Sequence, residues 1–186
     1  MTDIVLFAEE PSGRIVAEAL ARSLSLSARI FCIEHQGKSD LERSFPRKMR
    51  AWAGEPPRFI VMRDNDGAQC RDRKAALALL VPEVAKPRVK IRLVMQELES
   101  WYIGDPQALR EAGLLDAQRA KDWSKKQKYR NPDAIPRAKE AFRRALGERG
   151  QIELARLIGP RLDPGRNNSR SFHAFVGALR WAAGAA

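Results

Sequence analysis

The sequence has few of the residues that build disulfide frameworks and thiolate metal sites. Its 186 residues include only two cysteines, Cys32 and Cys70, and two histidines, His35 and His173. Two cysteines cannot form a disulfide framework, and a structural zinc site would have to recruit nearly all four residues at once. We therefore expect a reduced chain that works in the cytoplasm.

Long apolar runs are also missing. No segment approaches the roughly 18 uninterrupted apolar residues of a membrane-spanning helix, because the first apolar run stops at Glu9 and Glu10. Those carboxylates, together with Asp3 where a basic region would stand, argue against a signal peptide. We expect no membrane segment.

Acidic residues are the minority charge. The chain has 23 Asp and Glu against 34 Lys and Arg, a formal net charge of +11. A charge of this sign favours a polyanionic partner such as nucleic acid, although scattered charges on helix faces are commonly only solvated. With 44% hydrophobic residues the chain has enough apolar material for a folded core.

The first half of the chain alternates strand-like and helix-like patterns. Three short continuous apolar runs are typical of parallel strands that are covered on both faces, and a fourth, alternating run indicates a strand nearer the sheet edge. Pro46 is expected to break the second intervening helix into two. The pattern predicts an α/β, Rossmann-like fold with a mostly parallel four-stranded sheet and flanking helices. The predicted strands are Ile4–Ala8, Ile30–Ile33, Phe59–Met62 and Val89–Met95.

The second half has no convincing strand. Asp105 followed by Pro106 is a typical helix start, and apolar residues with helical spacing recur up to Ala183. We expect residues 1–104 to form the α/β domain and residues 105–186 to form a C-terminal helical extension packed on it.

Acidic residues follow three of the four predicted strands. Glu9 and Glu10 follow the first, Asp64 and Asp66 the third, and Glu97, with Glu99 two residues on, the fourth. The carboxyl ends of parallel strands meet in one crevice, where ligands of open α/β sheets bind. Carboxylates brought this close suit a hard cation, so we predict that the first five hold Mg²⁺ or Mn²⁺.

Each of these segments has a plainer interpretation. Asp64 to Gly67 has the composition of a turn, Glu9 and Glu10 suit the first turn of a helix, and Glu97 with Glu99 is compatible with an exposed helix start. Lys38 lies in the loop after the second strand and is either a phosphate contact in the same crevice or a solvated lysine.

A basic stretch between residues 121 and 130 is the candidate nucleic-acid contact. The cations expected to contact nucleic acid are Lys125, Lys126, Lys128 and Arg130, and two aromatic residues lie among the basic residues of the stretch. If Trp123 and Tyr129 are accessible, they can stack on unpaired bases. The alternative is a surface helix end whose two aromatics pack inward.

The ordered motifs of the chain resemble those of a bacterial TOPRIM-like family of uncharacterised function. The similarity covers almost the whole chain. The combination of motifs is specific, although each motif alone would be weak evidence for the family. The motifs that carry it are Ala8-Glu9-Glu10-Pro11-Ser12, Gly37-Lys38-Ser39-Asp40-Leu41, Arg63-Asp64-Asn65-Asp66 with Cys70, Glu97-Leu98-Glu99-Ser100-Trp101 with Asp105, Asn131-Pro132-Asp133, and Asn167-Asn168-Ser169-Arg170-Ser171-Phe172.

The resemblance implies a TOPRIM fold for residues 1–104, in which a glutamate after the first strand and an Asp-x-Asp after the third bind Mg²⁺ for phosphodiester chemistry. Here these residues are Glu9, Asp64 and Asp66. The chain departs from the pattern at Gly13, where many relatives have an acid, and at Glu10, where glycine is usual. Members are often encoded beside ATPases in defence or toxin-like modules, which implies a partner ATPase.

These observations predict a Mg²⁺-dependent nuclease. Its expected catalytic residues are Glu9, Asp64, Asp66 and Lys38, and the cation would activate water and stabilise the phosphate in the transition state. The alternative is a non-catalytic nucleic-acid-binding or regulatory subunit of an ATPase-containing complex. A phosphoacceptor signalling domain is a third hypothesis, against which the basic charge and the missing later strand with its lysine argue.

Overall fold

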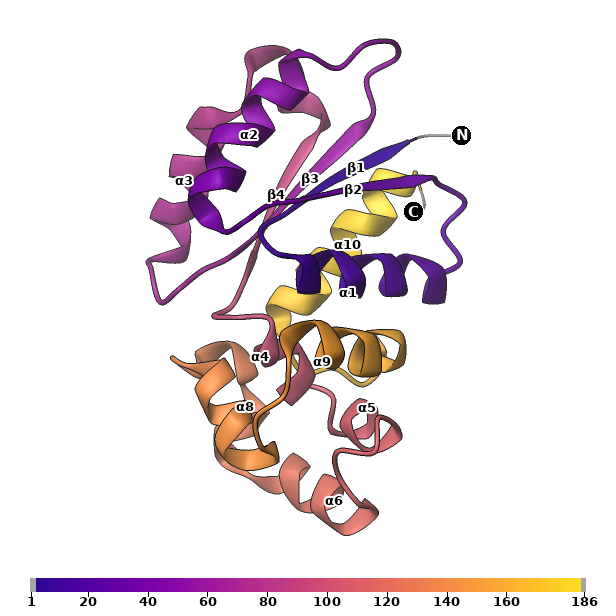
Figure 1. The fold of residues 1–186 in the computed structure, drawn as a ribbon, viewed down its shortest axis with the longest axis vertical. Coiled ribbons are helices and arrows are strands. Elements are labelled where there is room, and N and C mark those ends of the chain that lie inside the picture. The colour runs from indigo at the N-terminus through magenta and orange to yellow at the C-terminus, as the bar shows by residue number, and fades with distance from the viewer. Residues whose placement is uncertain (1–2, 185–186) are drawn as a thin grey trace.

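The computed structural model describes residues 3–184, and its centre is one four-stranded parallel sheet (Figure 1). The strand order is β2-β1-β3-β4, so β1 and β3 are central and β4 is an edge strand, as the sequence predicts. In register, Ala8 lies opposite Met62, and Asp64 lies opposite Val94. The strands are β1 (Ile4–Ala8), β2 (Ile30–Glu34), β3 (Arg58–Asp64) and β4 (Val89–Val94).

Helices cover both faces of the sheet, which explains why the central strands are continuously apolar. Every residue of β1 is buried, because its alternate side chains enter two different hydrophobic clusters. One cluster contains apolar residues of α1 (Pro11–Ser23) and α10 (Arg170–Ala183), and the other contains those of α2 (Lys38–Arg50) and α3 (Cys70–Leu80). The predicted α/β fold with a parallel sheet and flanking helices is confirmed.

The helix α2 corrects one expectation. It runs unbroken through Pro46, whereas the sequence predicted two short helices. Leu41, Phe45 and Met49 are all buried from the same face of α2. Their burial against the sheet offsets the hydrogen bond that the proline removes from the helix.

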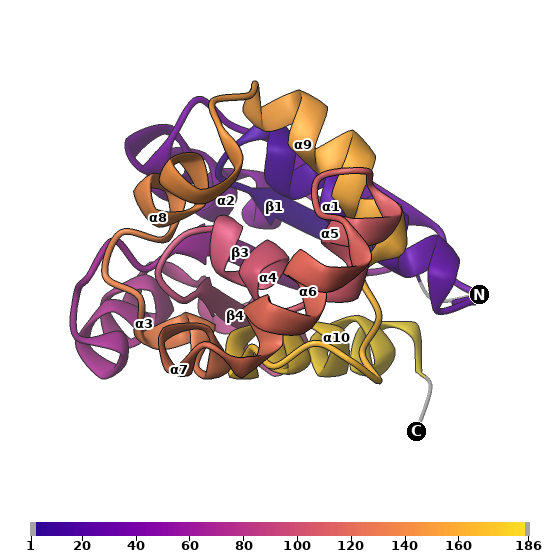
Figure 2. The same cartoon turned by 90° about the horizontal axis from the view of Figure 1, so that it is seen from below.

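The remaining helices gather at the end of the sheet where β4 leads into α4 (Figures 1 and 2). Among the described residues of this half there is no strand. Its helices are α4 (Glu99–Ile103), α5 (Pro106–Glu111), α6 (Ala117–Lys125), α7 (Gln127–Arg130), α8 (Ala138–Leu146) and α9 (Gln151–Ile158), with short 3₁₀ segments at Pro132–Ala134 and Gly159–Arg161. A further 3₁₀ segment, Glu83–Arg88, precedes β4.

One hydrophobic cluster joins these helices to the sheet. It extends from Leu6 of β1 through Trp101 of α4 and Phe175 of α10 to Phe142 of α8. Helix α10, the last of the chain, packs against β3 and β4 and so belongs to the layer on the sheet. The strand ends and the helical half are therefore packed against a common core.

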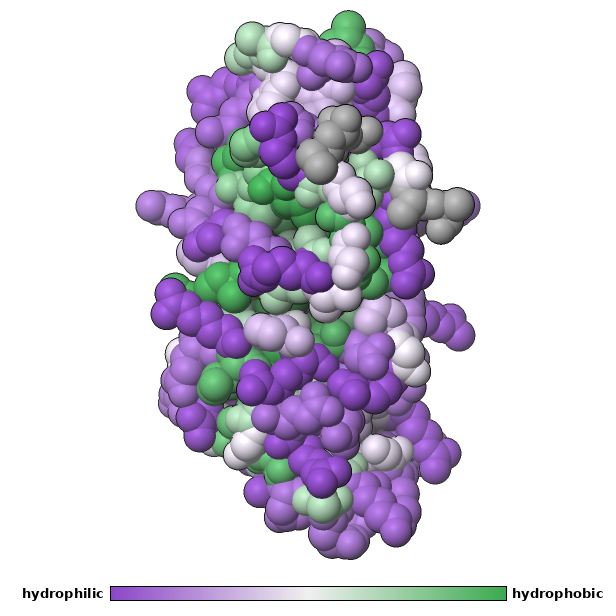
Figure 3. Space-filling model, turned by 90° about the vertical axis from the view of Figure 1, so that its right-hand side faces the viewer, coloured by the Kyte–Doolittle hydropathy of each residue, from purple (hydrophilic) through white to green (hydrophobic). Residues whose placement is uncertain are grey.

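The surface agrees with the composition. The face that carries both chain ends is mostly hydrophilic, and its apolar residues gather in the upper half (Figure 3). In residues 3–184 no helix is long and apolar enough to cross a membrane.

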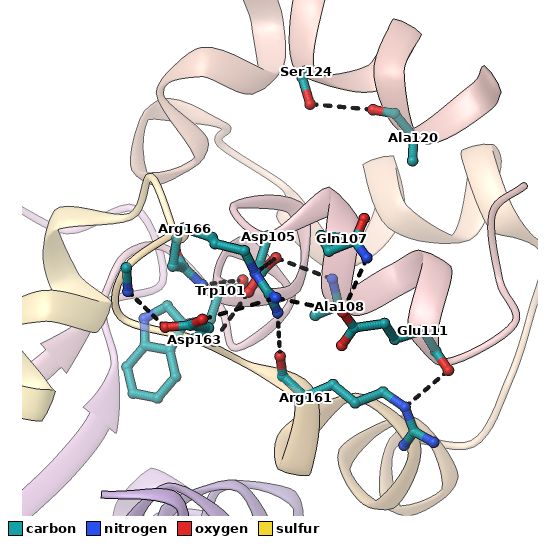
Figure 4. Close-up of polar contacts among 12 residues, drawn as sticks. Trp101, Asp105, Gln107, Ala108, Glu111, Ala120, Ser124, Arg161, Asp163 and Arg166 are labelled. Atoms are coloured by element: carbon teal, nitrogen blue, oxygen red, sulfur yellow. Dashed lines mark hydrogen bonds and ion pairs between the residues drawn. The ribbon is translucent and has the colours of Figure 1, made fainter. Parts of the chain in front are cut away.

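A buried carboxylate fixes the start of α5. Asp105 is 0% exposed and caps α5 by accepting a hydrogen bond from the Ala108 amide at 3.0 Å. Its other oxygen accepts from the Asp163 amide at 3.0 Å, and the Arg166 guanidinium lies 3.4 Å from the capping oxygen (Figure 4). Arg166 also lies 3.4 Å from Glu111, so this network ties the loop before α10 to α5.

We expect Asp105→Asn to lower the free energy of unfolding by about 2 kcal/mol. Asparagine caps a helix as well as aspartate does, but its amide group cannot satisfy both the Asp163 amide and the Arg166 guanidinium. The matched control is Asp116→Asn, because Asp116 caps α6 through the Arg119 amide at 2.7 Å and is exposed. Urea unfolding of both variants checks the prediction, and equal losses would contradict it.

Candidate functional site

The structure brings together the carboxylates that follow the two central strands. Glu9 leaves the end of β1, and its side chain accepts a hydrogen bond from the Asp64 amide at 3.1 Å. Glu10, the next residue, is at the N-cap position of α1 and makes no side-chain capping bond. A small pocket at this point is lined by Glu9, Glu10, Asp64 and Arg63 together with apolar side chains.

Burial makes these carboxylates hard to ionise. It raises the pKa of Asp64 well above its ordinary value, and repulsion by Glu9, and more weakly by Glu99, Glu10 and Asp66, acts in the same direction. Burial also raises the pKa of Glu9, although the Asp64 amide and the charge of Arg63 partly oppose it. The folded chain thus holds several carboxyl groups that repel one another, which is the electrostatic setting that a bound cation relieves.

Glu99, not Glu97, is the buried acid from the fourth strand end. Glu99 is 4% exposed, and burial raises its pKa to about 7. Glu97 is only partly buried, and its carboxylate instead accepts the Lys139 amide at 2.9 Å near the start of α8. The strand ends at Val94, so its period-two alternation does not extend to Glu97.

A signal for Glu99 was present in the sequence. Glu99 lies three and four residues before Tyr102 and Ile103, the spacing of one helix face, and all five residues of α4 are buried. A helix does start at Glu99, as the alternative interpretation predicted, but Glu99 is buried, so the expectation that this start is exposed is wrong.

The Tyr102 hydroxyl also faces this acidic region. Tyr102 is 1% exposed, and its oxygen is buried without a hydrogen-bond partner in the described structure. Burial raises the pKa of this hydroxyl well above its ordinary value, and the charges of Glu99 and Asp64 add to the shift. Buried polar atoms normally have a partner, so this hydroxyl indicates a group that the protein atoms do not supply.

Asp66 lies in the turn that follows β3. Residues 66 and 67 form the turn, and Asp66 has a positive φ of 52°, a conformation that aspartate tolerates. The side chain is 36% exposed and lies 3.5 Å from the Lys38 ammonium and 3.7 Å from the Arg63 guanidinium. The turn interpretation of this segment is confirmed, and Asp66 and Lys38 are paired with each other at the rim.

Arg63 is the only fully buried cation in the described chain, at 1% exposed. Its guanidinium lies 3.2 Å from Glu42 of α2 and donates to the Asp64 carbonyl at 3.0 Å. A buried charge must be paired and hydrogen-bonded to be tolerated. Arg63 therefore links the turn after β3 to α2 and places a positive charge next to Glu9 and Asp64.

The side chain of Gln96 holds the turn after β3 in place. Its side-chain oxygen, Oε1, accepts from the Asn65 side chain at 2.8 Å and from the Gly67 amide at 2.9 Å.

A second polar contact joins the loop before α8 to the start of α10. Asp133 accepts from the Ser171 amide at 2.8 Å and from the Ser169 hydroxyl at 2.5 Å. The last two motifs noted in the sequence thus meet in space, and their contacts are structural.

The residues present are chemically suited to a divalent cation, although the structure links only Glu9 and Asp64 directly among the described acids of the site. In the part of the chain that the structure describes, no group of three or more His, Cys, Asp or Glu residues is arranged to hold a metal ion. Carboxylate and hydroxyl oxygens are the donors that Mg²⁺ and Mn²⁺ prefer. The desolvated carboxyls and the partnerless Tyr102 hydroxyl fit such an ion, whereas Glu97 and Asp66 are engaged elsewhere.

The basic stretch forms the end of α6 and the short α7. Lys125, Lys126, Lys128 and Arg130 are all exposed, as the nucleic-acid hypothesis requires. The two aromatics are not available to bases: Trp123 is 4% and Tyr129 5% exposed, and their rings stack on each other at 4.1 Å. The stacking expectation is wrong, because these rings serve the core of the helical half.

The fold and the site define a class of protein: an α/β protein with a four-stranded parallel sheet, flanking helices and partly or fully buried carboxyls at the strand ends. Comparison with protein families then places the chain. Residues 8–180 match the family described as a domain of unknown function (DUF4276), and the chain belongs to that family. A search of curated proteins finds no match.

Solved structures with the same fold come from OLD proteins. The C-terminal region of the Burkholderia pseudomallei OLD protein superposes with a TM-score of 0.54 at 16% identity, over 98% of this chain and 99% of that one. A structure of the C-terminal region of the Xanthomonas campestris pv. campestris OLD protein gives 0.50 at 12% identity, over 99% and 97%. At such identities the likeness establishes a shared fold.

Proposed function

We propose that this protein is a Mg²⁺- or Mn²⁺-dependent nuclease of the TOPRIM type. The observation that carries the proposal is the group of Glu9, Asp64 and Glu99. The Glu9 side chain accepts from the Asp64 amide, Glu99 is buried and the other two are partly buried. The pKa values of all three carboxyls are raised, and Asp64 is repelled by both of the others. Retaining mutually repelling acids in a folded site costs stability, and such groups cluster at functional sites. The fold shared with the OLD C-terminal regions supports the same class.

The roles follow from the positions of the side chains. Glu9, Asp64 and Glu99 would hold the divalent ion, with Glu10 at the pocket entrance. A bound Mg²⁺ or Mn²⁺ supplies Lewis-acid stabilisation of the phosphate and lowers the pKa of water. The Lys38 ammonium, which pairs with Asp66 at the rim, is placed to neutralise a phosphate oxygen of the substrate. Arg63 keeps the turn that carries Asp64 in position.

Nucleic acid is the proposed substrate because of the charge balance. The chain carries a net charge of +11. Lysine and arginine side chains that contact phosphates and not base edges bind nucleic acid in a salt-dependent way, independent of sequence. A partner ATPase and a role in a defence module remain proposals that rest on the resemblance of the sequence motifs. A cytoplasmic location remains a proposal that rests on the low cysteine content.

A non-catalytic role is the second candidate, and one observation favours it. Among residues 3–184 no compact set of metal-ligating side chains is formed, as would suit a subunit that only binds nucleic acid for a partner ATPase. This alternative predicts salt-sensitive binding and no metal-dependent cleavage.

The test is a cleavage assay on single- and double-stranded DNA and RNA with Mg²⁺, with Mn²⁺ and with EDTA. We expect cleavage of at least one substrate with a divalent ion and none in EDTA. The control is Asp64→Asn purified identically, which separates the protein's own activity from a contaminant. Binding without cleavage under every condition, including with a neighbouring ATPase and ATP supplied, would favour the non-catalytic role.

A further inference from the structure

A basic pocket lies between α6, α7 and α8, apart from the strand-end acids. Its volume is about 400 Å³, within the range of pockets that hold small ligands. Cationic, aromatic and small side chains line it together with one acid. They are Arg119, Asp122, Trp123, Lys126, Lys128, Tyr129, Ala141, Arg144 and Ala145.

Some cations of the pocket already have a partner within the chain, and others form no ion pair. Arg144 pairs with Glu140 of its own helix, and Arg119 donates to the Ala145 carbonyl at 3.3 Å. Lys126 and Lys128 form no ion pair within the described part of the chain. The pocket thus has a net positive lining, and two of its ammonium groups are available to an anion.

Two stacked aromatic rings form one wall of the pocket. Trp123 and Tyr129 stack with an interplanar angle of 14°, and the Lys128 ammonium lies 4.6 Å from the Tyr129 ring centroid. A buried aromatic pair loses little further freedom when a ligand binds, so this wall adds little entropic cost to binding. The two aromatics that are unavailable for base stacking therefore still shape a binding site.

Helix α8 connects the pocket to the acidic region. The Lys139 amide near the start of α8 donates to Glu97 beside the strand ends, and Arg144 and Ala145 line the pocket. A rise of 1.5 Å per residue places the Arg144 backbone about 7.5 Å along the helix from Lys139. Successive phosphates of one DNA strand advance by about 3.4 Å along the duplex axis, so one strand that contacts both ends of α8 would span several nucleotides.

We propose that this pocket binds a phosphate group of the nucleic acid and thereby positions the strand for the acidic site. The proposal rests on the proposed function, and it names the contact that sets where the strand lies. Lysine ammonium groups and an arginine guanidinium are the side chains that recognise phosphate oxygens. The phosphate is either a terminal monoester or an internal phosphodiester, and both present the same anionic oxygens.

The segment itself offers a matched pair of variants. Lys126→Glu with Lys128→Glu reverses the two pocket ammonium groups, and Lys125→Glu with Arg130→Glu makes the same change of charge at exposed residues that do not line the pocket. Dissociation constants are measured in EDTA for short single strands of one sequence, with and without a terminal phosphate. Inorganic phosphate serves as the competitor. Circular dichroism verifies that both variants are folded, and Lys126→Gln with Lys128→Gln replaces the first pair if it is not.

We expect the pocket variant to bind roughly tenfold more weakly than the control variant, with a smaller dependence on salt. A loss confined to the phosphorylated strand identifies a terminal monoester as the ligand, and an equal loss on both strands identifies an internal phosphodiester. Equal weakening of the pocket and control variants would overturn the proposal, because diffuse charge would then explain the binding. Since the assay needs no metal, a protein that binds through the pocket but never cleaves refutes only the nuclease proposal.

Discussion

Asp64→Asn is expected to lower the rate of metal-dependent cleavage by roughly 10³-fold or more while it leaves nucleic-acid binding nearly unchanged. The Asp64 carboxylate would hold the ion that stabilises charge developing in the transition state, whereas exposed lysines and arginines would bind the nucleic-acid backbone. The variant should also be at least as stable as the wild type, because it removes a buried carboxyl that Glu9 repels. Single-turnover cleavage with Mg²⁺ and the dissociation constant in EDTA are measured together.

Glu97→Gln is the matched control for this prediction. Glu97 accepts a hydrogen bond from the Lys139 amide near the start of α8. Glutamine keeps a carbonyl acceptor for this bond, so the variant should retain cleavage within a few-fold of the wild type. If Glu97→Gln abolishes cleavage and Asp64→Asn does not, the acids have been assigned to the wrong roles.

In the absence of divalent ions the free energy of unfolding should fall as the pH rises from about 4.5 to 7. The pKa of Glu99 is about 7 in the folded protein against an ordinary value of 4.5, so in this range the folded state binds more protons than the unfolded state. The stabilisation is therefore fully present below pH 4.5, the pKa of Glu99 in the unfolded chain, and is lost as the pH rises through about 7, its pKa in the folded protein. Glu99 alone accounts for a fall of about 3 kcal/mol in the free energy of unfolding, and Glu9 and Asp64 act in the same direction.

Urea unfolding in EDTA across this pH range measures the effect, and Glu99→Gln should remove most of the slope. Glu97→Gln should leave most of the slope in place, because burial raises the pKa of Glu99 more than the charge of Glu97 does. A wild-type stability that is flat or rises between these pH values would show that Glu99 is ionised at little cost, and the description of a desolvated acidic cluster would then be incorrect.

The sheet could be predicted from the sequence because its central strands are buried on both faces. Runs such as Ile4–Ala8 are continuously apolar, and the alternation after Val89 correctly indicated an edge strand. The helix through Pro46 was missed because the cost of a proline is local, whereas the burial of its neighbours against the sheet is a tertiary effect. The division of the chain at residue 104 remains a prediction.

The site was only partly predictable for a related reason. Glu9 and Asp64 follow from the topology, since residues at the ends of adjacent parallel strands must be close. The choice between Glu97 and Glu99 depends on the residue at which the chain leaves the strand, and period-two alternation gives no information about that end. The stacking of Trp123 on Tyr129 depends on how α6 and α7 meet, which no local pattern specifies.

The most direct test of the central claim is a titration of the metal-free protein with Mn²⁺, in which free Mn²⁺ is measured by electron paramagnetic resonance. The wild type and Glu97→Gln should bind Mn²⁺ near neutral pH, and binding should weaken as the pH falls and the acids become protonated. Asp64→Asn and Glu99→Gln should each lose most of the binding. Equal binding by all four proteins, or no binding by the wild type, would contradict the assignment of Glu9, Asp64 and Glu99 as the cation site.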